Sequence, residues 1–348
     1  MYLFFSSDIY SLYKKDILSA ISLPQDYCLH FRYPKNLIPV EIISDVDSLI
    51  GKEGIIVYVS GNIYTQLEKD RNILFFPIRN VRVKNAYFEK ATGLVHIFLK
   101  LNRFIETKNI PTQELHNANH NLPPHKFIYK INEYSSSIVE WHDKVKKLVS
   151  FDKYFQDHLF FNINVRHSEK NYREQVEISY DDTENSSYFE LLEDKNYLLD
   201  LAIFNSSTDK SKFEDFSLKL SYASENFFIT NPESISIGAD ADNRSYKIIT
   251  KDIKSVSSSA YLKFQSFNKE KIIYDELLRL NIKRNNKKTL TYLFFSLLGI
   301  IGTFLLAFSA GKLASKGLND SIMGLILVSI IFMGSSAVGQ FYYFNKRN

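Results

Sequence analysis

Three residue types that mark particular classes of protein are scarce in this sequence of 348 residues. Its one cysteine, Cys28, cannot form an intrachain disulfide, so we expect a reducing compartment. Glycine (12) and proline (8) are few beside tyrosine (22) and phenylalanine (28), which excludes a disordered chain. A chain this rich in aromatic residues can bury a substantial core, and its length suggests more than one domain.

Familiar catalytic motifs are missing as well. The sequence has no GxGxxG fingerprint, no Walker loop, no Gly-x-Ser-x-Gly and no His-Glu-x-x-His. Asp181 and Asp182 fall in a polar stretch and predict a solvated turn, and Cys28 falls in an apolar, strand-like context. We therefore predict no catalytic residue and no cofactor, and expect a protein that is not an enzyme. A membrane-anchored enzyme is a third class, which polar side chains clustered in a cytosolic cleft would favour.

A metal site is not expected either. His116, His120 and His125 share a proline-rich loop with no cysteine nearby. Structural zinc needs four ligands of defined geometry, which three loop histidines do not supply. The loop is predicted to be solvated.

The chain contains two long charge-free runs, both near its end and separated by a polar link at 311–320. Each is about as long as the roughly 20 residues that a helix needs to cross a bilayer. Backbone polar groups must be satisfied within the segment in hydrocarbon, so each run should be a helix. The sequence predicts a transmembrane helical hairpin over 289–344, with helices at about 290–310 and 322–342. The alternative is a helical hairpin buried in a soluble core.

Basic residues flank this hairpin on its outer side. Six lie before the first run or after the second: Lys283, Arg284, Lys287, Lys288, Lys346 and Arg347. The link has only Lys312 and Lys316, offset by Asp320. This asymmetry predicts that both termini are cytoplasmic. The first eight residues lack the features of a signal peptide, so we expect a two-span membrane protein that inserts through its C-terminal hairpin.

Small residues recur along both runs and allow helix backbones to approach closely. The candidate helix-packing residues are Gly299, Gly302, Ala307, Gly311, Gly324, Gly334, Ser335 and Gly339. They can pack the two arms on each other, or pack hairpins of different protomers in an active homo-oligomer. Neither run has an ionisable residue, which disfavours a transporter or proton relay.

The region 1–110 is predicted to be a β-rich α+β domain. Apolar residues at helical spacing predict a helix from Ile9 to Ile21. Short β-branched and aromatic runs predict strands around it, and Val95, Ile97, Leu99 and Leu101 should share one face of the last strand.

The regions 111–155 and 267–288 are predicted to join larger parts. The first should contain a loop and a connector helix that begins at a capping box, Ser137-x-x-Glu140, and uses Trp141 as a packing anchor. The second should be a juxtamembrane helix, with Ile273, Leu277 and Leu280 on one side.

The region 156–266 contains about seven short strand patterns separated by polar turns, which predicts a two-sheet sandwich. The stretch from Tyr197 to Asn205, followed by 216–222 and 228–232, resembles immunoglobulin-like sandwich modules. The disulfide and core tryptophan of antibody domains are absent, which leaves the topology open.

Charge is distributed unevenly although the net charge is only +4. Eight basic and two acidic residues lie in 71–108, while ten acidic and three basic residues lie in 169–200. Phosphate binding needs several cations on one surface, and single-strand binding adds exposed aromatics. The candidate residues for a partner or nucleic-acid surface are Arg79, Arg82, Lys84, Lys100 and Arg103. The alternatives are a solvated sheet face, or a face for anionic lipid or an acidic protein.

The layout of a cytosolic β-rich body followed by two membrane helices resembles bacterial antiphage effectors, including the two-transmembrane proteins that accompany some retron reverse transcriptases. The resemblance implies abortive infection: a partner, such as the reverse transcriptase with its DNA–RNA product, silences the body, and release lets hairpins assemble and breach the inner membrane. The resemblance carries over no catalytic residues. The competing interpretation is a membrane-tethered, non-catalytic adaptor or scaffold.

Overall fold

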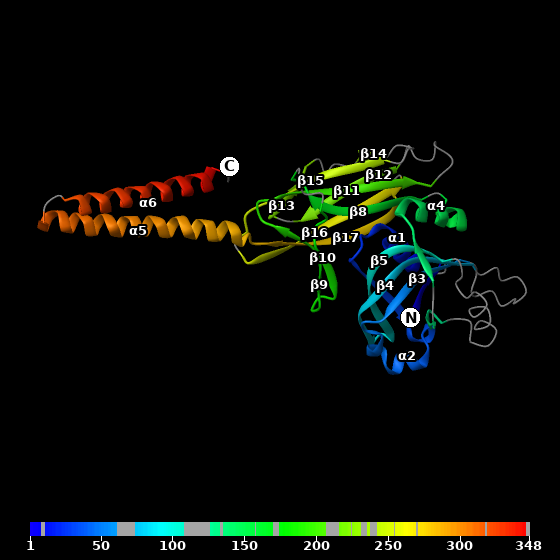
Figure 1. Cartoon of the computed structure of the whole chain (residues 1–348). Helices are drawn as coiled ribbons and strands as arrows, with labels where there is room; N and C mark the ends of the chain where they lie inside the picture. Colours follow the sequence, from blue (N-terminus) through cyan, green and yellow to red (C-terminus); the bar gives the residue numbers. More distant parts are fainter. Residues whose placement is uncertain are drawn as a thin grey trace, which may run out of the picture. The chain divides into compact units, whose positions relative to one another are not determined.

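The computed structural model describes residues 1–7, 11–60, 74–107, 126–132, 135–156, 158–169, 174–206, 216–223, 225–230, 235–236, 242–253, 255–268, 271–316 and 319–345. It forms two compact units, Met1–Lys283 and Arg284–Asn348. The first is mainly β and the second is a pair of helices, which confirms the predicted fold class (Figure 1). The loop with His116, His120 and His125 lies outside the described residues.

The first sheet has seven strands in the order β2-β5-β4-β3-β1-β6, with β7 paired to β5. Only β1 and β3 are parallel among these pairs. The strands are β1 (Tyr2–Ser7), β2 (Cys28–Pro34), β3 (Glu53–Ser60), β4 (Leu74–Glu89), β5 (Leu94–Thr107), β6 (Ile128–Lys130) and β7 (Ser136–Ile138).

The predicted alternation of β5 is confirmed. Val95, Ile97, Leu99 and Leu101 are wholly buried on one face of the sheet. Successive side chains of a strand point to opposite faces, so this apolar set fixes which face meets the core. Of the short apolar runs at 73–76 and 79–83, which predict two separate strands, the described residues belong to one long strand, β4, with two register shifts against β5.

Helices in the first unit are short. They are α1 (Ser11–Ser22), α2 (Val40–Ser44), α4 (Trp141–Phe151) and the 3-10 turns η1 (Lys35–Leu37), η2 (Val46–Leu49) and η4 (Lys153–Phe155). The helix predicted at Ile9 to Ile21 is confirmed as α1, and it packs against β1, β2, β4, β8 and β17.

The predicted capping box is wrong. Ser137 lies in β7, which pairs with the end of β5, and α4 begins four residues later with Glu140 as an N-cap that makes no side-chain bond. Backbone pairing to an available strand outcompeted the local capping preference. The buried Lys144 holds α4 in place instead, because its ammonium donates 2.7 Å to the Ile105 carbonyl oxygen above the Phe76 ring.

The predicted sandwich is confirmed as two facing sheets. One is ordered β13-β15-β11-β8 and the other β14-β12-β16-β17-β10-β9. Phe161 of β8 packs against Phe264 of β16 and Tyr274 of β17, which joins the two inner faces. The strands are β8 (Leu159–His167), β9 (Ile178–Asp181), β10 (Ser186–Leu192), β11 (Asn196–Asn205), β12 (Phe216–Ala223), β13 (Phe227–Ile229), β14 (Ile235–Ser236), β15 (Asp242–Thr250), β16 (Ser257–Asn268) and β17 (Lys271–Lys283).

The predicted juxtamembrane helix is wrong, because the segment is strand β17. Its backbone bonds antiparallel to β16 on one side and parallel to β10 on the other. Tyr274, Leu278, Leu280 and Ile282 are buried at period two, whereas Leu277 is exposed. The apolar residues of this segment fit both a helical spacing and a period of two. Backbone pairing with β16 and β10 decided for the strand, and the sequence pattern had not predicted β10.

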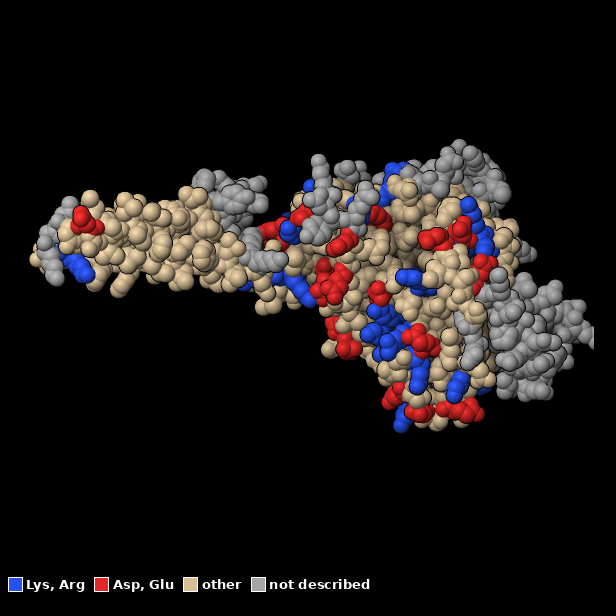
Figure 2. All heavy atoms as spheres, viewed as in Figure 1, with Lys and Arg blue, Asp and Glu red and all other residues tan. Residues whose placement is uncertain are grey.

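The second unit consists of α5 (Asn286–Lys316) and α6 (Asp320–Asn345), shown orange and red in Figure 1. Both are long and apolar enough to span a membrane, over Leu290–Ser315 and Asp320–Gly339, each with mean hydropathy 2.2. Only 11% and 17% of the most apolar windows are buried, unlike the core helices of a soluble protein. Figure 2 shows that this hairpin has almost no charge on the visible face except at its tip.

Candidate functional site

The small residues of the hairpin divide into two groups. A Cβ at Gly302 would lie 3.0 Å from the Met333 backbone nitrogen, one at Gly299 would lie 2.6 Å from Ser336 Oγ, and one at Gly339 would overlap the Phe295 ring. These three glycines therefore allow α5 and α6 to approach closely at these positions.

The other candidates face away from this contact. Gly311, Gly324 and Gly334 have nothing within 4 Å of an added Cβ, and Ala307 and Ser335 are exposed. They are available for packing against a second hairpin, which stays a prediction.

The five predicted cations of β4 and β5 do not form one free surface. Arg82 approaches Glu53 at 4.0 Å and donates to the Gly51 carbonyl oxygen. Lys100 pairs with Asp26 at 2.7 Å. Lys84 lies 5.9 Å from the centre of the Tyr180 ring, and Arg103 is exposed. Figure 2 shows blue and red residues interspersed over the first unit on the visible face.

Arg79 is a correction to the surface prediction, because it is only 2% exposed. Its Nε donates 2.7 Å to the Asn102 carbonyl oxygen, and its Nη1 donates to the carbonyl oxygens of Ala20 (3.0 Å) and Leu23 (2.7 Å). The guanidinium thus satisfies carbonyls at the C-terminal end of α1, where a cation also suits the helix dipole. Burial lowers the pKa of Arg79 to about 9, which leaves it charged at pH 7.

The aromatic residues near these cations mainly stack on one another. Tyr87 stacks on His96 at 4.7 Å, and Phe98 stacks on His30 at 4.2 Å. His96 and Phe98 are buried, so only Tyr87 offers an exposed ring in this group. The described residues therefore give little support to a base-stacking platform on this sheet face. Near this group, burial raises the pKa of the Cys28 thiol to about 12, which makes it a poor nucleophile.

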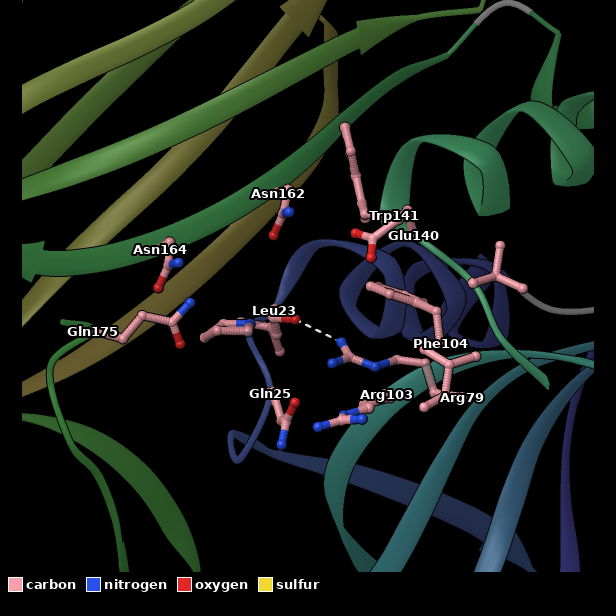
Figure 3. Close-up of a pocket in the computed structure, with 13 residues that line it drawn as sticks. Leu23, Gln25, Arg79, Arg103, Phe104, Glu140, Trp141, Asn162, Asn164 and Gln175 are labelled. Atoms are coloured by element: carbon pink, nitrogen blue, oxygen red, sulfur yellow. Dashed lines mark hydrogen bonds between the residues drawn. The ribbon is translucent and has the colours of Figure 1, made fainter. Parts of the chain in front are cut away.

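A polar pocket of about 350 Å³ opens where the first sheet, α4 and β8 meet (Figure 3). Its polar lining comes from segments far apart in the sequence: Gln25, Arg79, Arg103, Glu140, Asn162, Asn164 and Gln175. Apolar residues, including Phe104 and Trp141, form the rest of the wall. Trp141 is anchored by an Nε1 bond of 3.1 Å to the Ile21 carbonyl oxygen, so its predicted packing role is confirmed.

Among the pocket residues, the sequence analysis proposed only Arg79 and Arg103 for binding, and it placed them on a surface; it assigned Glu140 to a helix cap and Trp141 to packing. The four carboxamides were missed, because Asn162 and Asn164 simply occupy the polar positions of an alternating strand. The one available signal was that two successive outward positions of β8, Asn162 and Asn164, are amides, between Phe160 and Arg166 on the same face.

A second cluster of polar groups joins α1 to β17. Lys15 pairs with Asp275 at 2.8 Å, and Ser19 donates 2.5 Å to a Glu276 carboxylate oxygen. Asp16 on the same helix is 7% exposed. Burial raises the pKa of Asp16 to about 7 and also raises that of Glu276. This α1–β17 junction therefore contains two carboxyl groups that resist ionisation.

The Asp16 carboxyl should make the protein less stable as the pH rises. Its folded pKa of about 7 exceeds the usual aspartate pKa of 3.8, so its stabilising effect is complete below about pH 4 and is lost as the pH rises to 7. We expect Asp16→Asn to remove this loss, so that its stability relative to wild type improves by about 4 kcal/mol between pH 4 and pH 8.

Urea denaturation of both proteins at pH 4, 6 and 8 measures this difference. Burial lowers the pKa of His30 to about 4 and that of Lys144 to about 7, so both groups add to the pH dependence of stability. Because both proteins contain these residues, their contribution cancels in the difference between wild type and Asp16→Asn. Parallel pH profiles for the two proteins would contradict the assignment.

Comparisons with known proteins give little to add to this geometry. No family model and no curated protein matches the sequence. Among solved structures, the periplasmic chaperone SfaE is similar with 13% identity and a TM-score of 0.19, over 28% of this chain and 53% of that one. The chain thus spans about half the length of that structure, and so low a TM-score carries no argument.

Proposed function

We propose that this protein is a membrane effector of a bacterial antiphage (abortive infection) system, in which a cytosolic β-rich body controls a two-helix hairpin. One observation carries the proposal: β17 is held between β16 and β10 and continues into α5 through only Arg284 and Asn285. A strand fixed on both sides and followed by a two-residue connection leaves little slack. Displacement of β17 therefore pulls on the membrane helix.

The α1–β17 junction supplies a point at which such displacement can start. The Lys15–Asp275 ion pair and the Ser19–Glu276 hydrogen bond join helix α1 to β17, the strand that leads into α5. A partner that binds the body acts on the hairpin through this junction. The resemblance in layout to retron-associated effectors supports a reverse transcriptase with its DNA–RNA product as that partner.

The hairpin supports assembly rather than transport by one chain. Two helices cannot enclose an aqueous path, so disruption of the membrane requires several hairpins. The outward small residues Ala307, Gly311, Gly324, Gly334 and Ser335 allow close approach of a second copy. Basic residues beside both outer ends favour cytoplasmic termini in the inner membrane.

Expression of the protein without its partner should depolarise bacterial cells and admit a membrane-impermeant dye. Gly334→Leu should reduce the fraction of dye-positive cells severalfold, because a leucine there prevents close approach of the next hairpin while leaving the α5–α6 contact intact. The matched control is Leu327→Ile, since Leu327 is also exposed and keeps its size. Flow cytometry with a potential-sensitive dye measures both variants at equal membrane content.

The alternative is a membrane-tethered adaptor or scaffold. The specific observation in its favour is that Gly299, Gly302 and Gly339 already pack α5 on α6, so one hairpin is complete as an anchor. Normal growth and polarity at full expression of the wild-type protein would favour the tether and contradict the effector.

A further inference from the structure

The polar pocket beside α4 has a composition that packing alone does not explain. We propose that it binds a nucleotide, with the phosphate at Arg79 and Arg103 and the base at the carboxamides. This inference goes beyond the proposed membrane function and does not depend on it.

The two guanidinium groups of the pocket belong to Arg79 and Arg103. Nε and Nη1 of Arg79 are engaged by three carbonyl oxygens, whereas Nη2 has no hydrogen-bond partner among the described residues. Arg103 likewise has no ion pair among them. Figure 3 shows both guanidinium groups beside Gln25 at the same side of the pocket. Asp26 acts on Arg79 electrostatically, but its carboxylate is held by Lys100 at 2.7 Å.

Two neighbouring cations with unused N–H donors attract an oxyanion. A guanidinium presents its donors in a planar fork that matches phosphate, and such charge-assisted bonds are about twice as strong as neutral ones. The lining has two positive groups and one carboxylate, Glu140, so its formal charge is +1 and favours an anionic ligand. The Phe104 ring, 4.2 Å from the Arg79 guanidinium carbon, helps to hold that group in place.

Three carboxamides, Asn162, Asn164 and Gln175, line the opposite side of the pocket (Figure 3). A carboxamide offers a donor and an acceptor side by side, which matches the edge of a nucleobase. The Oδ1 of Asn164 accepts from its neighbour Val165, which leaves its NH₂ group to donate. The pocket wall also includes Trp141, whose ring supplies apolar surface for a planar ligand.

The volume of the pocket limits the size of its ligand. A volume of about 350 Å³ lies at the lower end of the 300–1,000 Å³ typical of small-ligand sites. This fits a single nucleotide rather than a nucleic-acid strand, which needs an extended groove.

Isothermal titration of the detergent-solubilised full-length protein tests the proposal with AMP, GMP, CMP and UMP. Inorganic phosphate, ribose 5-phosphate and glucose serve as partial ligands. We expect at least one nucleotide to bind at least tenfold more tightly than phosphate or ribose 5-phosphate. Arg103→Gln should weaken that nucleotide about 30-fold, and Asn162→Leu about tenfold. Arg82→Gln, which removes a cation of β4 outside the pocket, should leave binding unchanged.

Circular dichroism melting confirms that each variant is folded. The proposal is overturned if no nucleotide binds at millimolar concentration, or if Arg103→Gln binds as tightly as wild type. It is also overturned if phosphate or glucose binds as tightly as every nucleotide, because the carboxamides then read no base.

Discussion

Arg79→Leu is expected to destabilise the first unit by about 3–5 kcal/mol. The substitution removes the three hydrogen bonds that the Arg79 guanidinium donates to the carbonyl oxygens of Ala20, Leu23 and Asn102. Leucine fills part of the volume but donates no hydrogen bond. Buried carbonyl groups left without a partner cost about 1–3 kcal/mol each, so the loss is a sizeable share of the stability of a domain.

Urea denaturation followed by fluorescence measures this loss directly. The only tryptophan of the chain, Trp141, is bonded to Ile21 beside the same end of α1, so its emission reports on this region. Arg82→Leu is the matched control, since Arg82 lies on the same strand and is exposed, and it should change stability by less than about 1 kcal/mol. Equal urea midpoints of unfolding for Arg79→Leu and Arg82→Leu would show that the Arg79 hydrogen bonds do not stabilise the fold.

Gly302→Leu is expected to separate α5 from α6. An added Cβ would meet the Met333 nitrogen at 3.0 Å and the Ser329 carbonyl oxygen at 3.1 Å. Both are backbone atoms, which cannot rotate away as a side chain can. Relief requires a shift of α6, and overpacking of this kind costs about 1–3 kcal/mol.

A disulfide between positions 299 and 336 reports on the contact. A Cβ at Gly299 would lie 3.2 Å from the Ser336 Cβ, so a slight separation of the helices would bring the pair to the roughly 3.5–4.5 Å found in disulfides. In a Cys28→Ser background, Gly299→Cys with Ser336→Cys should therefore cross-link readily in membranes. Adding Gly302→Leu should lower the cross-linking yield severalfold.

Gly311→Leu is the matched control for this experiment, because nothing lies within 4 Å of its added Cβ. Its cross-linking yield should equal that of the parent pair. An unchanged yield with Gly302→Leu would contradict the close α5–α6 packing at this position.

The local sequence pattern was sufficient to predict secondary structure wherever it fitted either a helix or a strand but not both. The alternation of Val95, Ile97, Leu99 and Leu101 allowed only a strand with one buried face, and β5 has that form. The two charge-free runs allowed only long apolar helices, and α5 and α6 have that form. In these cases the burial of apolar side chains and the backbone bonds agree, so no distant residue is needed to decide.

Local pattern failed where a distant partner supplied the deciding bonds. The apolar residues of 267–288 fit a helix until β10 and β16 are present on either side, and Ser137 fits a helix cap until the edge of β5 is available. Arg79 fits a cationic surface until the end of α1 supplies its carbonyl acceptors.

Composition and local periodicity were therefore enough to predict a β-rich body, a sandwich and two helices long and apolar enough to span a membrane. Those features depend on composition and on periodicities within one segment. The tertiary structure alone decided that β17 leads directly into α5, that three glycines serve the contact within the hairpin, and that Arg79, Arg103 and the amides of β8 meet in one pocket. Each of these depends on groups that are far apart in sequence and come together only when non-local pairs form, which no pattern within a single segment can show.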